Sequence, residues 1–361
     1  MLKNIANTLI TWYIKNKREL PWRNTTDPYK IWLSEIILQQ TRVEQGLPYY
    51  HRFLKQYPTL KSLAKANDDE VMKLWQGLGY YSRARNLLST ARSIHTDNKG
   101  KFPTTWEEII KLKGIGDYTA AAIASFAFNL KHPVLDGNVY RFITRLIGIE
   151  TPLKTATTKA SVMMVLNEII SNVNDAATFN QALMDFGALQ CTPKNPKCAH
   201  CPFDSLCIAR IENKTGQIPV KGKAISIRER HFNYIIFLTN RNSIYMKKRT
   251  ANDVWQNLYD FPLIESLKPI ALKKIMLDPD FKSWTSKSEI TEILSLKPVL
   301  HKLSHQNIFV TFHIIKISKF LNSEKSLIFE IEKNIINSFA VPKVIETFLA
   351  SHYFLNSIKN I

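Results

Sequence analysis

Glycine is scarce in this chain, and long apolar runs are missing from it. Eleven glycines among 361 residues exclude collagen-like and low-complexity proteins. The longest mostly apolar stretch, Thr119 to Phe128, is too short and too rich in alanine to span a membrane. Residues 1–20 alternate apolar and charged positions and lack the apolar centre of a signal peptide. We therefore expect a cytoplasmic protein without a membrane-spanning segment.

Acidic residues are also few. The chain has 30 Asp and Glu against 49 Lys and Arg, which gives a formal net charge of +19. Its hydrophobic content of 45% is that of a folded protein, and its length predicts two or three domains. An excess of positive charge this large indicates a polyanionic partner, with nucleic acid as the first candidate and an anionic membrane surface as the second.

Only four cysteines occur, and they lie within one short segment as Cys191, Cys198, Cys201 and Cys207. A secreted disulfide scaffold would spread its cysteines along the chain, so we expect reduced thiols. Four thiolates at this spacing can surround one tetrahedral centre. Structural zinc sites usually combine two short Cys-x2-Cys pairs, whereas this segment has one, and an iron–sulfur cluster tolerates such spacing. The spacing favours an iron–sulfur cluster over zinc, and either metal over disulfides.

The hydrophobic pattern changes along the chain and divides it into three parts. Residues 1–210 have a helical pattern in which strands are hard to find. Residues 211–229 are polar, basic and interrupted by Gly and Pro, which is typical of a linker. Residues 230–361 contain short segments rich in β-branched and aromatic residues, with strands expected at 231–240, 243–250, 307–318 and 326–332 and a helix near 341–349. The sequence therefore predicts a helical domain followed by a smaller α+β domain.

A glycine pair separates two helical patterns at Leu112-Lys113-Gly114-Ile115-Gly116. Gly114 and Gly116 permit a tight turn with positive φ. Backbone N–H groups in such a turn, beside the start of the next helix, form a site for phosphate. An ordinary turn between helices is the alternative for so short a pattern.

Several longer blocks carry a family resemblance: LPWR at 20–23, WLSE and LQQT within 32–41, GLGYY and RARN within 77–86, and FNQA at 179–182. With the cysteine spacing, they resemble the MutY adenine DNA glycosylases of the helix-hairpin-helix, or endonuclease III, superfamily. The resemblance implies a glycosylase domain with a [4Fe–4S] cluster loop and a Nudix-like domain that recognises 8-oxoguanine. It implies a monomer that excises adenine mispaired with 8-oxoguanine or guanine in duplex DNA, with no membrane partner.

Two carboxylates suit that chemistry. Glu35 lies on a helix that is apolar on nearly every side, so its pKa should rise, although a partly exposed salt bridge is an equal alternative. Asp136 precedes a helix, where Asp is a good N-cap, and the resemblance makes it the aspartate beside the sugar. Breaking an N-glycosidic bond needs a neutral acid for the leaving base and a carboxylate for the cationic sugar.

Tyr118 separates two related activities. In endonuclease III a lysine at this place attacks the sugar and produces a lyase, and tyrosine cannot form that Schiff base. We therefore expect a monofunctional glycosylase in which Tyr118 and Asn138 lie near the sugar and Asp136. An endonuclease III-like lyase that acts on oxidised pyrimidines is the alternative.

The resemblance also assigns residues that bind DNA and bases. Gln40 and Tyr80 match residues that the family inserts around 8-oxoguanine, and Arg18, Trp22, Arg23 and Gln181 match its adenine pocket. Ser304 and His305 match its 8-oxoguanine loop, in which Leu303 replaces an aromatic residue. The segment after Pro262 lacks the acidic cluster of active Nudix enzymes, so we expect no pyrophosphatase activity.

Overall fold

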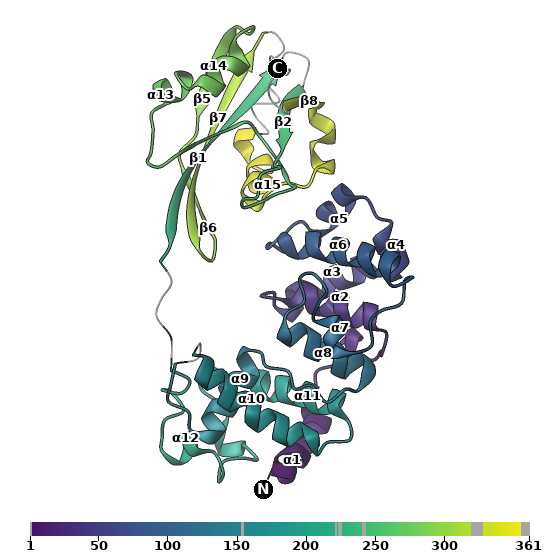
Figure 1. The fold of residues 1–361 in the computed structure, drawn as a ribbon. Coiled ribbons are helices and arrows are strands. Elements are labelled where there is room, and N and C mark those ends of the chain that lie inside the picture. The colour runs from purple at the N-terminus through teal and green to yellow at the C-terminus, as the bar shows by residue number, and fades with distance from the viewer. Residues whose placement is uncertain are drawn as a thin grey trace. The chain divides into compact units, whose positions relative to one another are not determined.

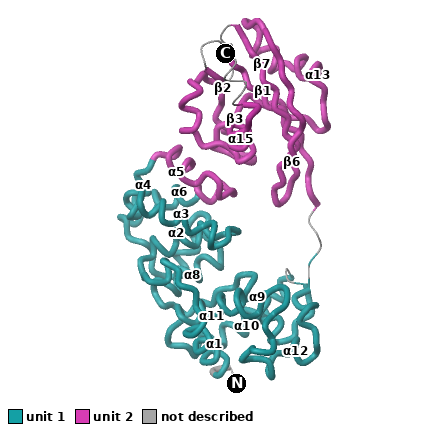
Figure 2. The backbone as a smooth tube through the Cα atoms, turned by 180° about the vertical axis from the view of Figure 1, so that it is seen from behind, with its two compact units in different colours: residues 1–66, 86–223 teal, residues 67–85, 224–361 magenta. Residues whose placement is uncertain are grey.

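The computed structural model describes residues 2–152, 155–220, 222, 226–239, 243–318 and 328–354. The chain forms two compact units: Met1–Ala66 with Asn86–Lys223, and Asn67–Arg85 with Ala224–Ile361. Figures 1 and 2 show the elements and the two units. The predicted domain limits at 210 and 230 stay predictions, and residues 221 and 223–225 of the predicted linker lie outside the described residues.

The first unit is helical, as the sequence predicts. Its main helices are α1 (Leu2–Asn16), α2 (Pro28–Leu38), α3 (Val43–Gln56), α4 (Leu60–Ala64), α7 (Trp106–Ile109), α8 (Asp117–Phe128), α9 (Gly137–Ile147), α10 (Ala156–Ser171), α11 (Ala176–Asp185) and α12 (Ile208–Ile211), and most of α6 (Ser82–Asp97) also belongs to it. Short 3-10 helices η1 (Pro21–Arg23) and η3 (Cys198–His200) and a π-helical turn η2 (Phe186–Gln190) complete this unit.

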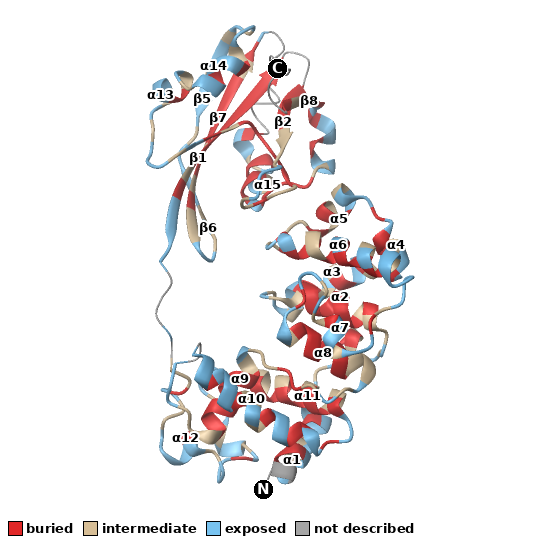
Figure 3. Ribbon diagram, in the orientation of Figure 1, coloured by how far each residue is buried: buried red, intermediate tan, exposed pale blue. Residues whose placement is uncertain are grey.

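Helix α2 is buried on nearly every side, which matches its sequence. Asp27 caps it by accepting a hydrogen bond from the Tyr29 N–H, and every residue from Ile31 to Ile37 is buried. It packs against α8, whose small residues from Thr119 to Ser125 are also buried. Figure 3 shows this buried interior. Because small side chains let two helices approach closely, a polar group on α2 loses most of its water.

The second unit contains an eight-stranded mixed sheet with the path β3-β2-β1-β7-β5. Its strands are β1 (Arg228–Thr239), β2 (Ser243–Lys248), β3 (Tyr259–Asp260), β4 (Leu263–Ser266), β5 (Ile290–Ser295), β6 (Val299–Lys302), β7 (Gln306–Ile317) and β8 (Ile328–Glu332). Central β1 and β7 run parallel with Arg228 opposite Gln306, and the other pairs are antiparallel. This unit also contains α5 (Asp68–Trp75), α13 (Leu272–Met276), α14 (Pro279–Thr285), η4 (Lys333–Ser338) and α15 (Lys343–Leu349).

Both faces of the sheet are covered. Ile235 and Phe237 of β1 pack with Phe281 and Trp284 of α14. Alternate residues face the other way, since Tyr234 stacks on Phe312, which stacks on Phe348 of α15. A strand covered on both faces is apolar almost throughout, and β1 has that composition.

The predicted α+β composition is confirmed, and the predicted strands correspond to β1, β2, β7 and β8. Asn240, Ser326 and Leu327, at the ends of two predicted strands, lie outside the described residues. Within the described part of the chain, no helix is both long enough and apolar enough to span a membrane.

Candidate active site

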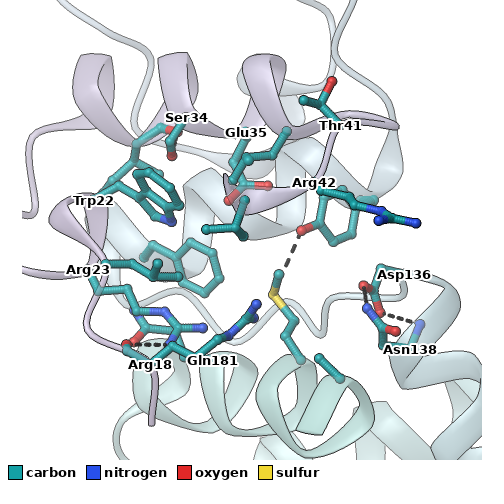
Figure 4. A pocket seen from close by; sticks show the side chains of 18 of the residues that line it. Arg18, Trp22, Arg23, Ser34, Glu35, Thr41, Arg42, Asp136, Asn138 and Gln181 are labelled. Atoms are coloured by element: carbon teal, nitrogen blue, oxygen red, sulfur yellow. Dashed lines mark hydrogen bonds between the residues drawn. The ribbon is translucent and has the colours of Figure 1, made fainter. Parts of the chain in front are cut away.

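A cavity of about 310 Å³ in the first unit brings together residues from opposite ends of that unit's sequence. Its size is that of a small-molecule site. Of the residues singled out in the sequence, it is lined by Arg18, Trp22, Arg23, Glu35, Tyr118, Asp136, Asn138 and Gln181 (Figure 4). The catalytic candidates and the predicted base pocket therefore share one cavity.

Glu35 is the buried acid of this cavity. Its residue is 5% exposed, and burial raises the pKa of its carboxyl to about 7. An interaction with the Tyr118 hydroxyl and the charge of Arg23 lower that pKa, whereas the negative charge of Asp136 raises it. A large fraction of Glu35 is therefore protonated at neutral pH and able to donate a proton. Its burial favours the buried acid over the exposed salt bridge.

Asp136 lies across the cavity as the N-cap of α9, so the helix-cap interpretation is confirmed. Its Oδ1 accepts hydrogen bonds from the N–H groups of Asn138 (2.9 Å) and Val139 (2.7 Å). Its Oδ2 accepts one from Nδ2 of Asn138 at 2.8 Å. Three donors and the positive end of a helix stabilise a negative charge on this carboxylate. The same contacts that cap the helix hold an anion beside the cavity.

Tyr118 lies in the first turn of α8 and is partly buried. Its hydroxyl donates a long hydrogen bond to Sδ of Met184 at 3.7 Å. Burial, followed by the charges of Glu35 and Asp136, raises its pKa well above the ordinary value. The phenol therefore stays neutral and offers a hydrogen-bond donor between the two carboxyl groups.

Asp185 organises the arginines at the other side of the cavity, a role that the sequence did not reveal. Its fully buried carboxylate accepts hydrogen bonds from Arg18 Nη2 (2.6 Å) and Arg23 Nη1 (2.6 Å). Burial opposes ionisation, but the hydrogen bond and charge of Arg23, with the charge of Arg18, hold the pKa of Asp185 below its usual range. The pair of arginines is partly neutralised by this one anion.

Gln181 reaches the cavity from α11 and is half-buried. The hydroxyl of Tyr13 on α1 donates a 2.6 Å hydrogen bond to its Oε1. Sequence analysis did not single out Tyr13, because the two residues are 168 positions apart.

The glycine turn lies between α7 and α8. Gly114 has φ of +83°, and a Cβ there would lie 2.7 Å from Cβ of Asn86, so the expected glycine requirement is confirmed at this position. Gly116 has φ of −104° and is the N-cap of α8, so it does not have the positive φ that the pattern permits. Both glycines are exposed. The turn thus presents the start of α8, whose first N–H groups have no partner within the helix.

The four cysteines line a second, small cavity in the same unit. Nη1 of Arg145 donates to Sγ of Cys191 at 3.4 Å, and Arg141 donates to the Cys191 carbonyl at 2.8 Å. Burial raises the pKa of the Cys191 thiol, and the hydrogen bond and charge of Arg145 lower it. Among the described residues, no group of three or more His, Cys, Asp or Glu is arranged to hold a metal ion.

The remaining candidates lie outside the cavity. Gln40 follows α2, is exposed and has φ of +56°. In the second unit, Tyr80 has φ of +46° and its hydroxyl hydrogen-bonds the hydroxyl of Ser304, beside exposed His305. Left-handed backbone at a residue other than glycine is strained and is common at ligand-binding positions.

Comparison with known proteins agrees with this fold. The family model of the HhH-GPD superfamily base excision DNA repair proteins matches residues 33–166. A thermostable thymine-DNA glycosylase structure aligns with a TM-score of 0.53 and 29% identity over 58% of this chain and 97% of its own. A structure of endonuclease III with DNA, 19% identical with a TM-score of 0.50 over 59% of this chain and 98% of its own, shares the fold.

Comparison of sequences identifies the family more specifically than comparison of folds. The adenine DNA glycosylase of Homo sapiens is 38% identical over 60% of this chain and 41% of its own length. That of Buchnera aphidicola subsp. Schizaphis graminum is 35% identical over 95% of this chain and 97% of its own length. Because that likeness extends through both units, this chain belongs to the adenine DNA glycosylase family of the HhH-GPD superfamily.

Proposed function

We propose that this chain is a monofunctional DNA glycosylase that hydrolyses the N-glycosidic bond of adenine mispaired in duplex DNA. The observation that carries this proposal is the pairing of Glu35, whose pKa is about 7, with hydrogen-bonded Asp136 across one cavity. Two carboxyl groups in opposite protonation states are what cleavage of a glycosidic bond requires.

In the proposed reaction the adenine leaves the helical stack and enters the cavity. Glu35 donates its proton to the base while the bond from the sugar C1′ to N9 breaks, and the bonding electron pair leaves with adenine. Asp136 stabilises the positive charge that develops on the sugar. A water molecule then adds to C1′ and releases a proton, which leaves an abasic site and restores the acid through solvent.

Tyr118 supports hydrolysis over a lyase reaction. It occupies the position at which the lyase branch has a nucleophilic lysine, and its raised pKa keeps the phenol from acting as a nucleophile. An endonuclease III-like lyase is therefore the weaker candidate.

Single-turnover excision of adenine opposite 8-oxoguanine tests the proposal. Glu35→Gln should lower the rate by about 10²-fold or more, because it removes the general acid. Glu168→Gln, on the exposed face of α10, is the matched control and should keep the wild-type rate. A Glu35→Gln protein that cleaves at the wild-type rate would contradict the assignment.

The second unit is proposed as a Nudix-related domain that recognises 8-oxoguanine through Tyr80, Ser304 and His305. Gln40 of the first unit is proposed as a residue that contacts the DNA. The support for the recognition domain is the shared hydrogen bond of Tyr80 and Ser304 and the left-handed backbone of Tyr80. Helix α13 has the sequence LKKIM without an acidic residue, so no pyrophosphatase activity is proposed for this unit. We propose that the protein acts where chromosomal DNA lies. We also propose that it acts as a monomer.

The four cysteines are proposed to hold a [4Fe–4S] cluster. They line one cavity, and Arg145 and Arg141 at Cys191 suit an anionic group. A cluster binds its thiolates through several irons, so they need not converge on one ion. Lys194 and Lys197 of this loop are exposed and suit phosphate contacts. Purified protein should absorb near the iron–sulfur charge-transfer band, and colourless protein with stoichiometric zinc would refute the cluster.

A further inference from the structure

The contact between Tyr13 and Gln181 has a consequence for base selection. Tyr13 is 5% exposed, and its hydroxyl donates to the Gln181 carbonyl oxygen at 2.6 Å. The guanidinium of Arg23, itself held by Asp185, lies 5.6 Å from the Tyr13 ring centre. Tyr13 is thus held in place by its packing in the core and by the guanidinium of Arg23 over its ring.

A glutamine side chain alone cannot discriminate between two bases in which hydrogen-bond donor and acceptor are exchanged. Rotation of its amide by 180° exchanges a carbonyl acceptor for an NH2 donor. At Gln181 such a rotation would direct NH2 at the Tyr13 oxygen and leave the tyrosine proton without its acceptor. Among the described residues no second acceptor for this hydroxyl is recorded. A buried donor without a partner is unfavourable, so one amide orientation dominates.

Adenine matches that orientation. On its Watson–Crick edge the N6 amino group is a donor, and the neighbouring ring nitrogen N1 is an acceptor. The free lone pair of Oε1 can accept from N6 while Nε2 donates to the ring nitrogen. Hypoxanthine has a carbonyl oxygen in place of the N6 amino group, so two hydrogen-bond acceptors, this oxygen and Oε1, would face each other. Hypoxanthine N1 also carries a proton, so this edge presents an acceptor and a donor and requires the amide orientation that Tyr13 opposes.

We propose that Tyr13 is a specificity-determining positioning residue that fixes the Gln181 amide to accept adenine and to reject 6-oxopurines such as hypoxanthine. The inference rests on the proposed function, since it takes Gln181 to face the flipped base. Tyr13 touches no reacting atom and acts through Gln181.

The experiment compares single-turnover excision of adenine with that of hypoxanthine, each opposite 8-oxoguanine in the same duplex. Tyr13→Phe keeps the ring and removes only the hydroxyl. The ratio of the adenine rate to the hypoxanthine rate should fall about fivefold, the value of one ordinary hydrogen bond. In a Gln181→Ala background, Tyr13→Phe should leave the ratio unchanged, because no amide remains to be oriented.

Tyr29→Phe is the matched control. The Tyr29 hydroxyl is also buried and also donates a 2.6 Å hydrogen bond, to the Tyr57 carbonyl, outside the cavity. Its loss should lower stability as Tyr13→Phe does and leave the ratio at the wild-type value.

The outcomes separate the two proposals. Wild-type protein that excises adenine, with a ratio that Tyr13→Phe does not change, would overturn the inference and leave the function intact. An equal fall of the ratio in Tyr29→Phe, or in Tyr13→Phe with Gln181 absent, would overturn it as well. Wild-type protein that fails to excise adenine would refute the proposed function itself.

Discussion

Removal of the Glu35 carboxylate should stabilise the protein at alkaline pH while it slows excision by about 10²-fold or more. The pKa of Glu35 is raised from 4.5 to about 7 in the folded protein. A carboxyl with a raised folded pKa stabilises the fold fully below its unfolded pKa, and this contribution is lost as pH rises from 4.5 through 7. At about 1.4 kcal/mol per pKa unit, the total loss is about 3 kcal/mol.

Most of that loss falls within an accessible pH range. Between pH 5 and pH 8 linkage predicts a decrease of about 2–3 kcal/mol in the free energy of unfolding that depends on Glu35. Glu35→Gln has no such titration. The difference in unfolding free energy between Glu35→Gln and wild type should therefore grow by about 2–3 kcal/mol in favour of the variant over this range.

Chemical denaturation of both proteins at pH 5, 6, 7 and 8 measures this difference. Effects of the amide on packing are the same at each pH and cancel, as do titrations elsewhere in the chain. Exposed Glu168→Gln serves as control and should show a constant difference from wild type. If the unfolding free energies of Glu35→Gln and wild type changed in parallel from pH 5 to pH 8, Glu35 would titrate as it does in water. That result would also contradict its role as the general acid.

Three further predictions concern neighbouring groups. The single-turnover rate should fall above pH 7, where Glu35 loses its proton. Tyr118→Phe should move this fall to higher pH by about one unit, because the hydrogen bond from Tyr118 lowers the pKa of Glu35 in the wild type and is missing in the variant. An unchanged pH profile would argue against contact between these groups. Asp185→Asn should cost about 3 kcal/mol of unfolding free energy, because it leaves buried Arg23 unpaired, and should move the same fall in rate to lower pH; an upward movement would contradict this electrostatic account. Gly114→Ala should lower stability by about 1–2 kcal/mol and weaken binding to duplex DNA in a titration, because φ is +83° and the new Cβ meets a side chain; stability equal to wild type would show that the turn tolerates a side chain.

Local chemistry predicted much of the fold. The strands β1, β2 and β7 follow from runs of β-branched and aromatic residues, and a strand buried on both faces has that composition wherever it lies. The positive φ of Gly114 follows from a glycine between two helices, but Gly116 in the same pattern is an ordinary N-cap. Two nearby glycines therefore identify a turn without showing which of them needs left-handed backbone.

The sequence by itself determined that Glu35 lies on a helix that is apolar on nearly every side, but it left burial and a partly exposed salt bridge as equal alternatives. It also determined the N-cap role of Asp136, which depends only on the helix that follows. Tertiary structure alone decided that these carboxyl groups face one cavity, that Asp185 neutralises two arginines, and that Tyr13 orients Gln181. The physical reason is range: the apolar pattern of a helix and its cap are set within that helix, whereas burial, ion pairs and hydrogen bonds between helices depend on how distant segments pack.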